Sequence, residues 1–156
     1  MNLEFVNPFV SATVNVVRTM AATDLKVGKI QTKDSKLTEG VVTGIIGLAS
    51  EKASGNMVLS FDQPSILGIV KRMLMEEFTE INADVVDAVG ELTNMICGGA
   101  KADLSQKGYI FDMAIPVMIV GKNVEVKQLS EAPTIVIPFY TQDGKFVVEA
   151  NLAKKG

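Results

Sequence analysis

Residues 83–107 combine side chains that could act on another molecule. Asp87, Glu91 and Asn94 are separated by four and then three residues, so they share one face of an α-helix. Glu91 and Asn94 would lie about 4.5 Å apart along the helix axis. A carboxylate beside a carboxamide can bind two neighbouring polar groups, and a carboxamide can orient a water molecule through one donor and one acceptor. Neither group is by itself a nucleophile or a general base at neutral pH. The pattern therefore indicates binding of polar groups on another molecule, with a carboxamide able to position water.

The same side chains also fit a solvated helix face, which is the ordinary meaning of a charged stripe on an amphipathic helix. Two features favour a contact surface instead. Gly98 lies on the polar arc one turn beyond Asn94, where no core packing calls for it, and glycine inside a helix costs about 0.5–1 kcal/mol relative to alanine. Asn94 is itself a poor residue for an exposed helix, because its amide competes for backbone hydrogen bonds. A missing side chain at Gly98 would let a partner approach the backbone closely.

The composition excludes several classes of site. The 156 residues contain no histidine and one cysteine, Cys97, which excludes histidine-dependent triads, histidine-ligated metals and an internal disulfide. We expect Cys97 to pack as a small apolar residue. The net charge is −3 and no basic cluster exceeds a pair, so nucleic acid is not an expected partner. Without a signal-peptide pattern or an apolar run long enough to span a bilayer, we expect a cytoplasmic protein with no membrane association.

Local signals predict three helices and several strands. Asn7-Pro8 predicts the start of a helix over 8–22, and Asp62-Gln63-Pro64 the start of a second helix that ends near Met75. The third helix covers 83–107 and ends at Gly108. Strand-like segments are 25–32, 40–50, 57–61, 110–120, 133–141 and 145–152.

Turn residues join some of these strands. We expect Ser54-Gly55-Asn56 to form the turn of one hairpin and Gln142-Asp143-Gly144 the loop of another. Pro116 predicts a sheet edge or a bulge within 110–120, and 122–132 reads as an irregular connection. Because helices and strands come in runs, the pattern favours an α+β fold with helices on an antiparallel sheet. Nothing divides the chain, so we expect a single domain over residues 1–156.

The chain resembles the CheC/CheX/FliY family of bacterial chemotaxis phosphatases, and most closely its CheX branch. The resemblance rests on Asp87-x3-Glu91-x2-Asn94, followed by Gly98-Gly99-Ala100-Lys101 and then by Pro116. It extends over nearly the whole chain through Asn7-Pro8-Phe9, Gly44-Ile45-Ile46-Gly47-Leu48, Gly90-Glu91-Leu92-Thr93-Asn94-Met95-Ile96, Lys107-Gly108-Tyr109 and Ile135-Val136-Ile137-Pro138-Phe139. A glutamate three residues before an asparagine has no specificity alone; within this context it is a strong signal.

The resemblance implies a CheC-like fold, in which long helices pack on an antiparallel sheet with a pseudo-twofold internal duplication. It implies a phosphatase that hydrolyses the aspartyl phosphate of a CheY-type receiver. Asn94 would orient the attacking water, and Glu91 would pair with the receiver's active-site lysine. The Mg²⁺ ion would belong to the receiver, so this chain would bind no metal or cofactor of its own. Around the pair, we expect Asp87, Met95, Gly98 and Lys101 to contact the partner.

One departure concerns the first helix, because some family members carry the motif there as well. The equivalent spacing in this chain reads Ser11-x3-Asn15-x2-Arg18. Asn15 offers no charge to a lysine and Arg18 cannot accept a proton from water, so we expect this face to be catalytically silent, as in CheX. The resemblance also implies a homodimer formed through β structure. The alternative function is a non-catalytic dimeric scaffold related to the flagellar switch proteins.

Overall fold

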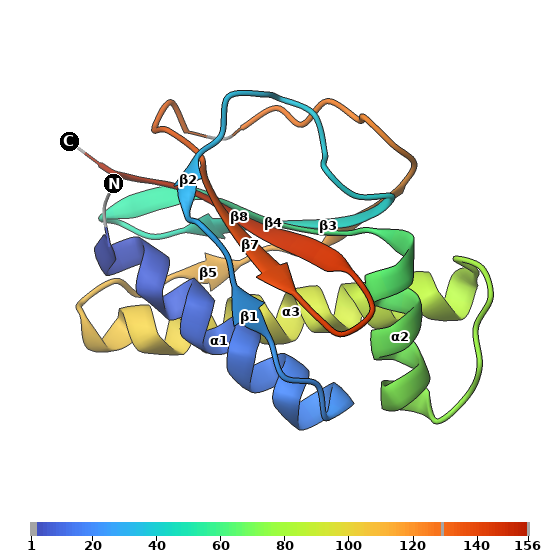
Figure 1. Cartoon of the computed structure of the whole chain (residues 1–156). Helices are drawn as coiled ribbons and strands as arrows, with labels where there is room; N and C mark the ends of the chain where they lie inside the picture. Colours follow the sequence, from blue (N-terminus) through green and yellow to red (C-terminus); the bar gives the residue numbers. More distant parts are fainter. Residues whose placement is uncertain (1–2, 129, 156) are drawn as a thin grey trace.

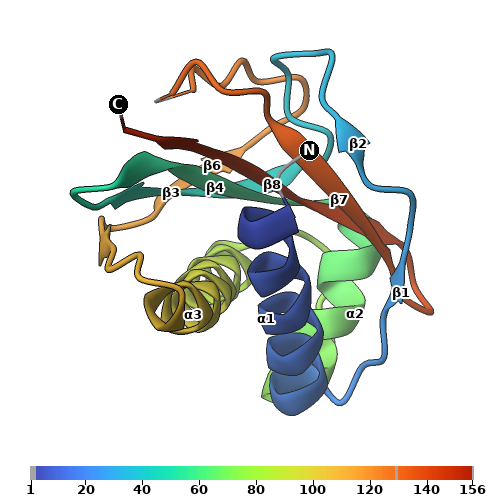
Figure 2. The same ribbon diagram turned by 90° about the vertical axis from the view of Figure 1, so that its left-hand side faces the viewer.

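Three helices cover one face of an antiparallel sheet in the structure, a computed structural model that describes residues 3–128 and 130–155 (Figure 1). The elements are, in order, α1 (Leu3–Ala21), β1 (Lys26–Val27), β2 (Gln31–Thr32), β3 (Val42–Ala49), β4 (Ala53–Phe61), α2 (Gln63–Leu74), α3 (Ala83–Gln106), β5 (Asp112–Met113), β6 (Val117–Val120), β7 (Ile135–Tyr140) and β8 (Lys145–Lys154). Figure 2 shows α1 beneath the sheet, between α3 and α2. The predicted α+β class is confirmed, and so is the order of helices and strands.

The sheet is built from two equivalent hairpins. Its strand order is β1-β7-β8-β4-β3-β5, with β2 also on β7 and β6 also on β3. The β3–β4 hairpin and the β7–β8 hairpin therefore meet at β4 and β8, which pair from Ala53↔Lys154 to Phe61↔Phe146. Short strands that follow α1 border β7, and short strands that follow α3 border β3. This exchange between the halves is the topology expected of an internal duplication.

The two faces of the sheet are covered differently. Side chains on the helix face, such as Phe61, Phe139 and Phe146, are at most 1% exposed and form the core with the helices. The opposite face lies under the connections formed by residues 28–41, 122–128 and 130–134 (Figure 1). These connections bond to each other, since Thr38 N–H donates to Val124 O and Val126 N–H donates to Lys36 O, both at 2.9 Å. The described residues of the irregular connection predicted over 122–132 therefore cover this face of the sheet.

The first helix begins earlier than Asn7-Pro8 predicts, so that expectation was wrong. α1 starts at Leu3 and contains Pro8 in its interior. A proline has no N–H to donate to the carbonyl four residues before it, which here is Glu4 O. That oxygen accepts a hydrogen bond from Lys107 Nζ at 3.3 Å. A long-range contact thus satisfies a group that the proline would have left without a donor, and this contact is invisible to local sequence signals.

The turn expected at Ser54-Gly55-Asn56 was also wrong, because these residues lie inside β4. The turn is instead at 50–52, where Ser50 Oγ accepts the N–H groups of Lys52 and Ala53 at 3.2 and 2.9 Å. Gly55 is required by the neighbouring strand, since a side chain there would overlap the backbone of Asn151. The second hairpin loop is one residue longer than expected and covers 141–144.

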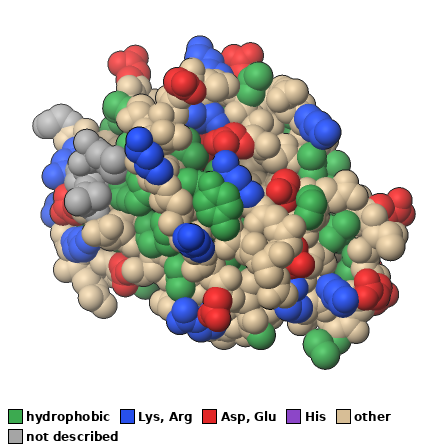
Figure 3. Space-filling model, viewed as in Figure 1, with side chains coloured by type: hydrophobic (Ala, Val, Ile, Leu, Met, Phe, Trp, Pro, Cys, Tyr) green, Lys and Arg blue, Asp and Glu red, His purple; other side chains and the backbone are tan. Residues whose placement is uncertain are grey.

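Other local predictions are confirmed. Asp62 caps α2 by accepting Ser65 N–H at 2.8 Å, and the helix ends at Met75, whose φ is 56°. Pro116 lies between β5 and β6 at the sheet edge and divides the strand expected over 110–120. Figure 3 shows acidic and basic side chains interspersed over the face drawn there. Among the residues the structure describes, no helix is long and apolar enough to cross a membrane.

Candidate functional site

The helix α3 carries the predicted site, and both of its ends are fixed by specific contacts. Asn82 has an extended backbone and accepts Val85 N–H through Oδ1 at 3.0 Å, which satisfies one of the free donors of the first turn. At the other end, Gly108 adopts φ +92° and Tyr109 N–H donates to Leu104 O at 3.0 Å. The predicted end at Gly108 is confirmed, because glycine adopts this left-handed conformation readily.

Close contacts on two sides fix the rotation of α3 about its axis. A side chain at Gly44 of β3 would overlap Thr93, so the helix lies directly on the strand there. Thr93 is fully buried and donates its Oγ1 to Val89 O at 2.7 Å. A methyl group at Gly99 would lie 3.0 Å from Ala12 Cβ of α1. With these sides held by β3 and α1, the remaining arc of the helix must face outward.

The outward arc is the predicted stripe, which we call the outer stripe and define as Asp84, Asp87, Glu91, Asn94, Gly98 and Lys101. The first four residues are exposed, and Gly98 and Lys101 are half-buried. Met95 is also half-buried and borders the stripe. The structure therefore brings all the predicted site residues to one surface of one helix.

Glu91 and Asn94 are free to bind another molecule. Within residues 3–128 and 130–155, neither side chain makes a hydrogen bond or an ion pair. Their three-residue spacing on α3 places them about 4.5 Å apart along its axis. A carboxylate and a carboxamide so placed present one acceptor and one donor–acceptor group to a partner. The outer stripe contains no hydroxyl, thiol or imidazole group, so the pair has no conventional nucleophile beside it.

Gly98 differs from the other glycines of α3. A side chain at Gly98 would meet no atom within 4 Å, whereas Gly99 is packed against α1 and a methyl group at Gly90 would lie 3.5 Å from Met118 Sδ. Packing against α1 thus accounts for Gly99, whereas the distance at Gly90 is ordinary van der Waals contact that would admit a methyl group. Nothing in the described residues requires glycine at 98, which sharpens the expectation that a partner approaches there.

Cys97 lies on the inner side of the outer stripe and is fully buried. Burial raises the pKa of its thiol to about 12, and the positive charge of Lys101 offsets only part of that rise. The thiol is therefore protonated at neutral pH and cannot serve as a thiolate nucleophile. The expectation that Cys97 is a packing residue agrees with this placement. Among the described residues, no group of three acidic, cysteine or histidine side chains could hold a metal ion.

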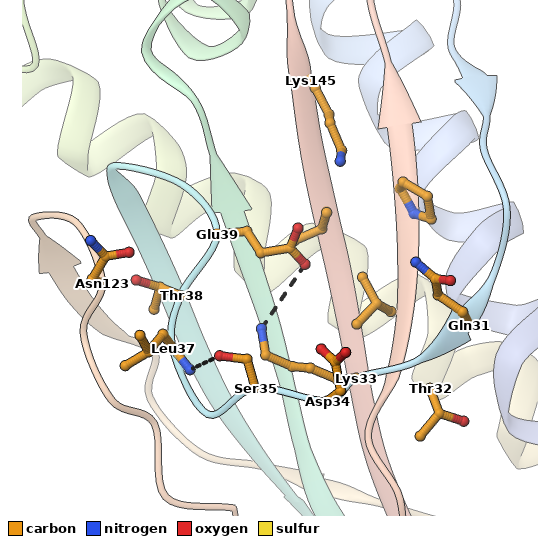
Figure 4. A pocket seen from close by; sticks show the side chains of 13 residues that line it. Gln31, Thr32, Lys33, Asp34, Ser35, Leu37, Thr38, Glu39, Asn123 and Lys145 are labelled. Atoms are coloured by element: carbon orange, nitrogen blue, oxygen red, sulfur yellow. Dashed lines mark hydrogen bonds and ion pairs between the residues drawn. The ribbon is translucent and has the colours of Figure 1, made fainter.

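A second polar constellation lies on the opposite face of the sheet and was missed by sequence reasoning. A hollow of about 410 Å³ there is bordered by Lys33, Glu39 and Lys145 (Figure 4). Lys33 Nζ donates to Glu149 Oε2 at 2.7 Å, and Glu39 Oε2 lies 4.0 Å from the same nitrogen. Burial raises the pKa of Glu149, and Lys33 partly opposes the rise. This pair fastens the connection after β2 to β8, and the one sequence signal for it is a glutamate inside an apolar strand.

The corresponding residues of α1 are exposed as well. Ser11 and Asn15 face solvent, and Arg18 Nε donates to Asp24 Oδ1 at 3.2 Å. The structure thus places Ser11, Asn15 and Arg18 on an accessible surface, as their spacing predicts, but with chemistry unlike that of the outer stripe.

Comparison with known proteins gives evidence about the family of the chain that does not depend on the geometry of the outer stripe. The model of the family described as chemotaxis phosphatase CheX matches residues 42–140, a range that includes all of α3. The CheY-P phosphatase CheX of Thermotoga maritima is 23% identical over 145 residues, which cover 92% of either chain.

Solved structures extend the comparison over the whole chain. A CheC-like superfamily protein from Shewanella sp. PV-4 is 41% identical, with a TM-score of 0.90 and coverage of 100% of both chains. The CheX of a CheX–CheY–BeF3–Mg²⁺ complex from Borrelia burgdorferi is 27% identical, with a TM-score of 0.78 and coverage of 97% of this chain and 98% of that one.

Proposed function

The chain belongs to the chemotaxis phosphatase CheX family, and we propose that it hydrolyses the aspartyl phosphate of a CheY-type receiver. The observation that carries the proposal is the exposed and unpaired Glu91–Asn94 pair at the centre of the outer stripe. A curated relative is a CheY-P phosphatase, and a structural relative forms a complex with CheY. Membership of the family confirms the resemblance drawn from the sequence.

The reaction needs little covalent chemistry from this chain. The receiver supplies the acyl phosphate and the Mg²⁺ that its own acidic residues hold, and water attacks phosphorus in line with the departing carboxylate. What the phosphatase adds is position, which is worth several kcal/mol when it fixes a near-attack geometry. This explains how a chain without histidine and with a buried thiol can act as a hydrolase. We propose that it binds no metal or cofactor itself.

Asn94 is the catalytic residue in this proposal. Its carboxamide enters the receiver's active site, accepts a hydrogen bond from the attacking water through Oδ1 and donates from Nδ2. The water is thereby held on the side of the phosphorus opposite the leaving carboxylate. Support comes from the free side chain and from its position on a helix held rigidly by β3 and α1.

Glu91 anchors the complex. Its carboxylate pairs with the receiver's active-site lysine, and this ion pair fixes the angle at which Asn94 enters. Closure of the complex removes water from the pair, which strengthens the interaction relative to one on an open surface.

The neighbouring residues complete the contact surface. Gly98 allows the receiver to approach the α3 backbone, Met95 contributes an apolar contact at the border, and Asp87 and Lys101 face charged groups on the receiver. The α1 residues Ser11, Asn15 and Arg18 take no part. Because the substrate is a receiver of a chemotaxis pathway, we propose that the protein acts in the cytoplasm.

The homodimer belongs to the same proposal, and the sheet edge at β6 supports it. β6 pairs with β3 on one side and has no strand on its other side among the described residues. Ile115, Val117 and Val120 are 87%, 60% and 58% exposed along this edge. An exposed apolar edge strand is a template for pairing with another chain. A second copy would cover it by antiparallel pairing of its own β6.

The dimer is tested with matched edge variants. Val117→Asp should give a monomer by sedimentation equilibrium, while Val27→Asp on the opposite edge (37% exposed in the wild-type protein) should leave a dimer. A wild-type monomer at micromolar concentration, or a dimer that survives Val117→Asp, would contradict this edge as the interface.

The phosphatase activity is tested by multiple turnover. A CheY-type receiver is phosphorylated with acetyl phosphate in Mg²⁺, the donor is removed, and loss of the aspartyl phosphate is followed with and without one-hundredth as much of this protein. We expect faster loss, abolished by EDTA because the receiver's Mg²⁺ is needed. Binding of the receiver without acceleration would support the scaffold function instead.

A further inference from the structure

The outer stripe carries its charges in a fixed order. Asp84, Asp87 and Glu91 form its N-terminal part, Asn94 and Gly98 are uncharged, and Lys101 ends it. The acidic part lies near the helix N-terminus and the lysine lies toward the C-terminus. That order also suits the helix dipole, so the dipole by itself does not distinguish a functional role from a structural one.

The charges of the stripe have no partner among the described residues, whereas some other surface charges are paired. Arg18 pairs with Asp24, and Lys71 pairs with Glu77. In contrast, Asp84, Asp87 and Lys101 make no ion pair or hydrogen bond with any of residues 3–128 and 130–155. These charges can therefore interact electrostatically with a docking partner.

The length of the stripe matches the size of the proposed partner. Asp84 and Lys101 are seventeen positions apart on α3, which corresponds to about 25 Å and approaches the diameter of a small domain. Seven positions separate Asp84 from Glu91, and seven separate Asn94 from Lys101, or about 10 Å in each direction. A receiver centred on the Glu91–Asn94 pair would thus cover both charged ends.

We propose that this order of charge sets the direction in which the receiver docks and selects among receivers. The inference rests on the proposed function. With Glu91 on the receiver's lysine and Asn94 at its phosphoryl group, Asp84 and Asp87 meet basic side chains beside that lysine. Lys101 meets acidic side chains on the side of the metal-binding residues. Asp87 and Lys101 are specificity-determining residues, and receivers with the opposite charge order are disfavoured.

The position of these charges at the rim of the interface predicts which kinetic constant they affect. Charges at the rim of an interface change the association rate and its dependence on salt more than they change a step after binding. At physiological ionic strength the screening length is about 8 Å, so the rim charges still act over the distances within the docked complex. The expected effect is therefore on KM, and it should decline as salt is added.

A charge exchange tests the inference without altering net charge. Asp87→Lys/Lys101→Asp keeps the net charge of −3 but reverses the order along the stripe. With the phosphorylated CheY-type receiver of the turnover assay, we expect KM to rise about tenfold and kcat to stay within twofold. The ratio of KM values should fall toward one between 50 and about 500 mM NaCl.

A matched control separates order from overall charge. Asp103→Lys changes the net charge as much as Asp87→Lys does, at an exposed position of α3 outside the stripe. We expect about a fivefold rise in KM for Asp87→Lys and less than a twofold rise for Asp103→Lys. Circular dichroism and thermal unfolding verify that each variant is folded.

The outcomes distinguish this inference from the proposed function. If the wild-type protein accelerates hydrolysis and the exchanged variant has the wild-type KM, the charge order has no role and the inference is overturned. Equal effects of Asp87→Lys and Asp103→Lys would overturn it as well. If the wild-type protein fails to accelerate hydrolysis at all, it is the proposed phosphatase function that fails.

Discussion

The helices α1 and α3 are built alike and differ in what they present to solvent. They lie side by side beneath the sheet (Figure 2), and each buries a threonine that donates to the carbonyl four residues earlier. Thr13 donates to Phe9 O and Thr93 to Val89 O, both at 2.7 Å. On α3, the outward face carries a free carboxylate and a free carboxamide. On α1, it carries Ser11, Asn15 and an arginine already bonded to Asp24.

The difference teaches that the duplicated scaffold supplies the surface and that a few side chains supply the chemistry. Both helices have the length, the rigidity and the exposure to meet a partner. An arginine has no acceptor atom to orient water, and an uncharged amide cannot neutralise a lysine. In the proposed mechanism, the side chains at outward positions one helical turn apart therefore decide whether a helix can act on the receiver. The following predictions test that distinction.

The largest effect is expected from Asn94→Ala. Loss of a positioned polar group typically costs about 10²–10³ in rate, so kcat should fall by about 10²-fold or more while receiver binding is retained. The matched control is Asn15→Ala on α1, which removes the same group from the other helix and should leave kcat within twofold. Wild-type kcat in Asn94→Ala would remove Asn94 from the mechanism.

A smaller effect, on binding, is expected from Glu91→Ala. Truncating one partner of a desolvated ion pair costs about 2 kcal/mol or more, equivalent to a roughly 30-fold weaker complex. Titration calorimetry with a receiver activated by beryllofluoride and Mg²⁺ measures the change. Glu51→Ala, in the exposed turn between β3 and β4, serves as control and should bind normally. Unchanged affinity in Glu91→Ala would place the anchor elsewhere.

Gly98→Ala should move stability and binding in opposite directions. Alanine stabilises a helix interior by about 0.5–1 kcal/mol relative to glycine, and an added methyl group at 98 meets nothing within 4 Å. We expect a higher Tm together with a KM raised about fivefold, since even a methyl group holds the receiver away from the backbone. At Gly99, where the added methyl group would lie 3.0 Å from Ala12 Cβ, the same substitution should lower Tm. A stabilised Gly98→Ala protein with unchanged KM would show that the receiver does not approach the α3 backbone at Gly98.

The smallest effect is expected from Arg18→Ala on α1. Its ion pair with Asp24 is exposed on both sides, and such pairs contribute about 0–1 kcal/mol. Both the turnover rate and the free energy of unfolding should be nearly unchanged. A tenfold loss of activity would mean that α1, and not α3 alone, meets the receiver.

The sequence predicts those parts of the fold that local interactions decide. The capped start of α2 at Asp62 and the end of α3 at Gly108 are confirmed, because neighbouring residues make the deciding hydrogen bonds. The start of α1 and the role of Gly55 were predicted wrongly, since both depend on contacts with Lys107 and Asn151, far along the chain.

In the candidate site, too, the sequence predicted what local spacing decides and missed what long-range contacts decide. Helical spacing correctly placed Glu91 and Asn94 on one outward face, because α3 is regular between its ends. The Lys33–Glu149 pair joins residues 116 positions apart and depends on the strand order, so no local pattern could reveal it. The roles of Glu91 and Asn94 in hydrolysis stay predictions.

The proposed role of α3 is tested most directly by determining which helix lies against the phosphorylated site of the receiver. Cys97 is buried and its thiol pKa is raised to about 12, so a cysteine engineered on the surface can be spin-labelled selectively. A nitroxide at Ala102→Cys, beside the outer stripe, should broaden the amide resonances around the phosphorylated aspartate of a ¹⁵N-labelled receiver with beryllofluoride and Mg²⁺. A nitroxide at Ser11→Cys on α1, which packs on α3 at the Ala12–Gly99 contact, should broaden those resonances less strongly than the nitroxide at Ala102→Cys. Broadening from Ser11→Cys with none from Ala102→Cys would contradict the account.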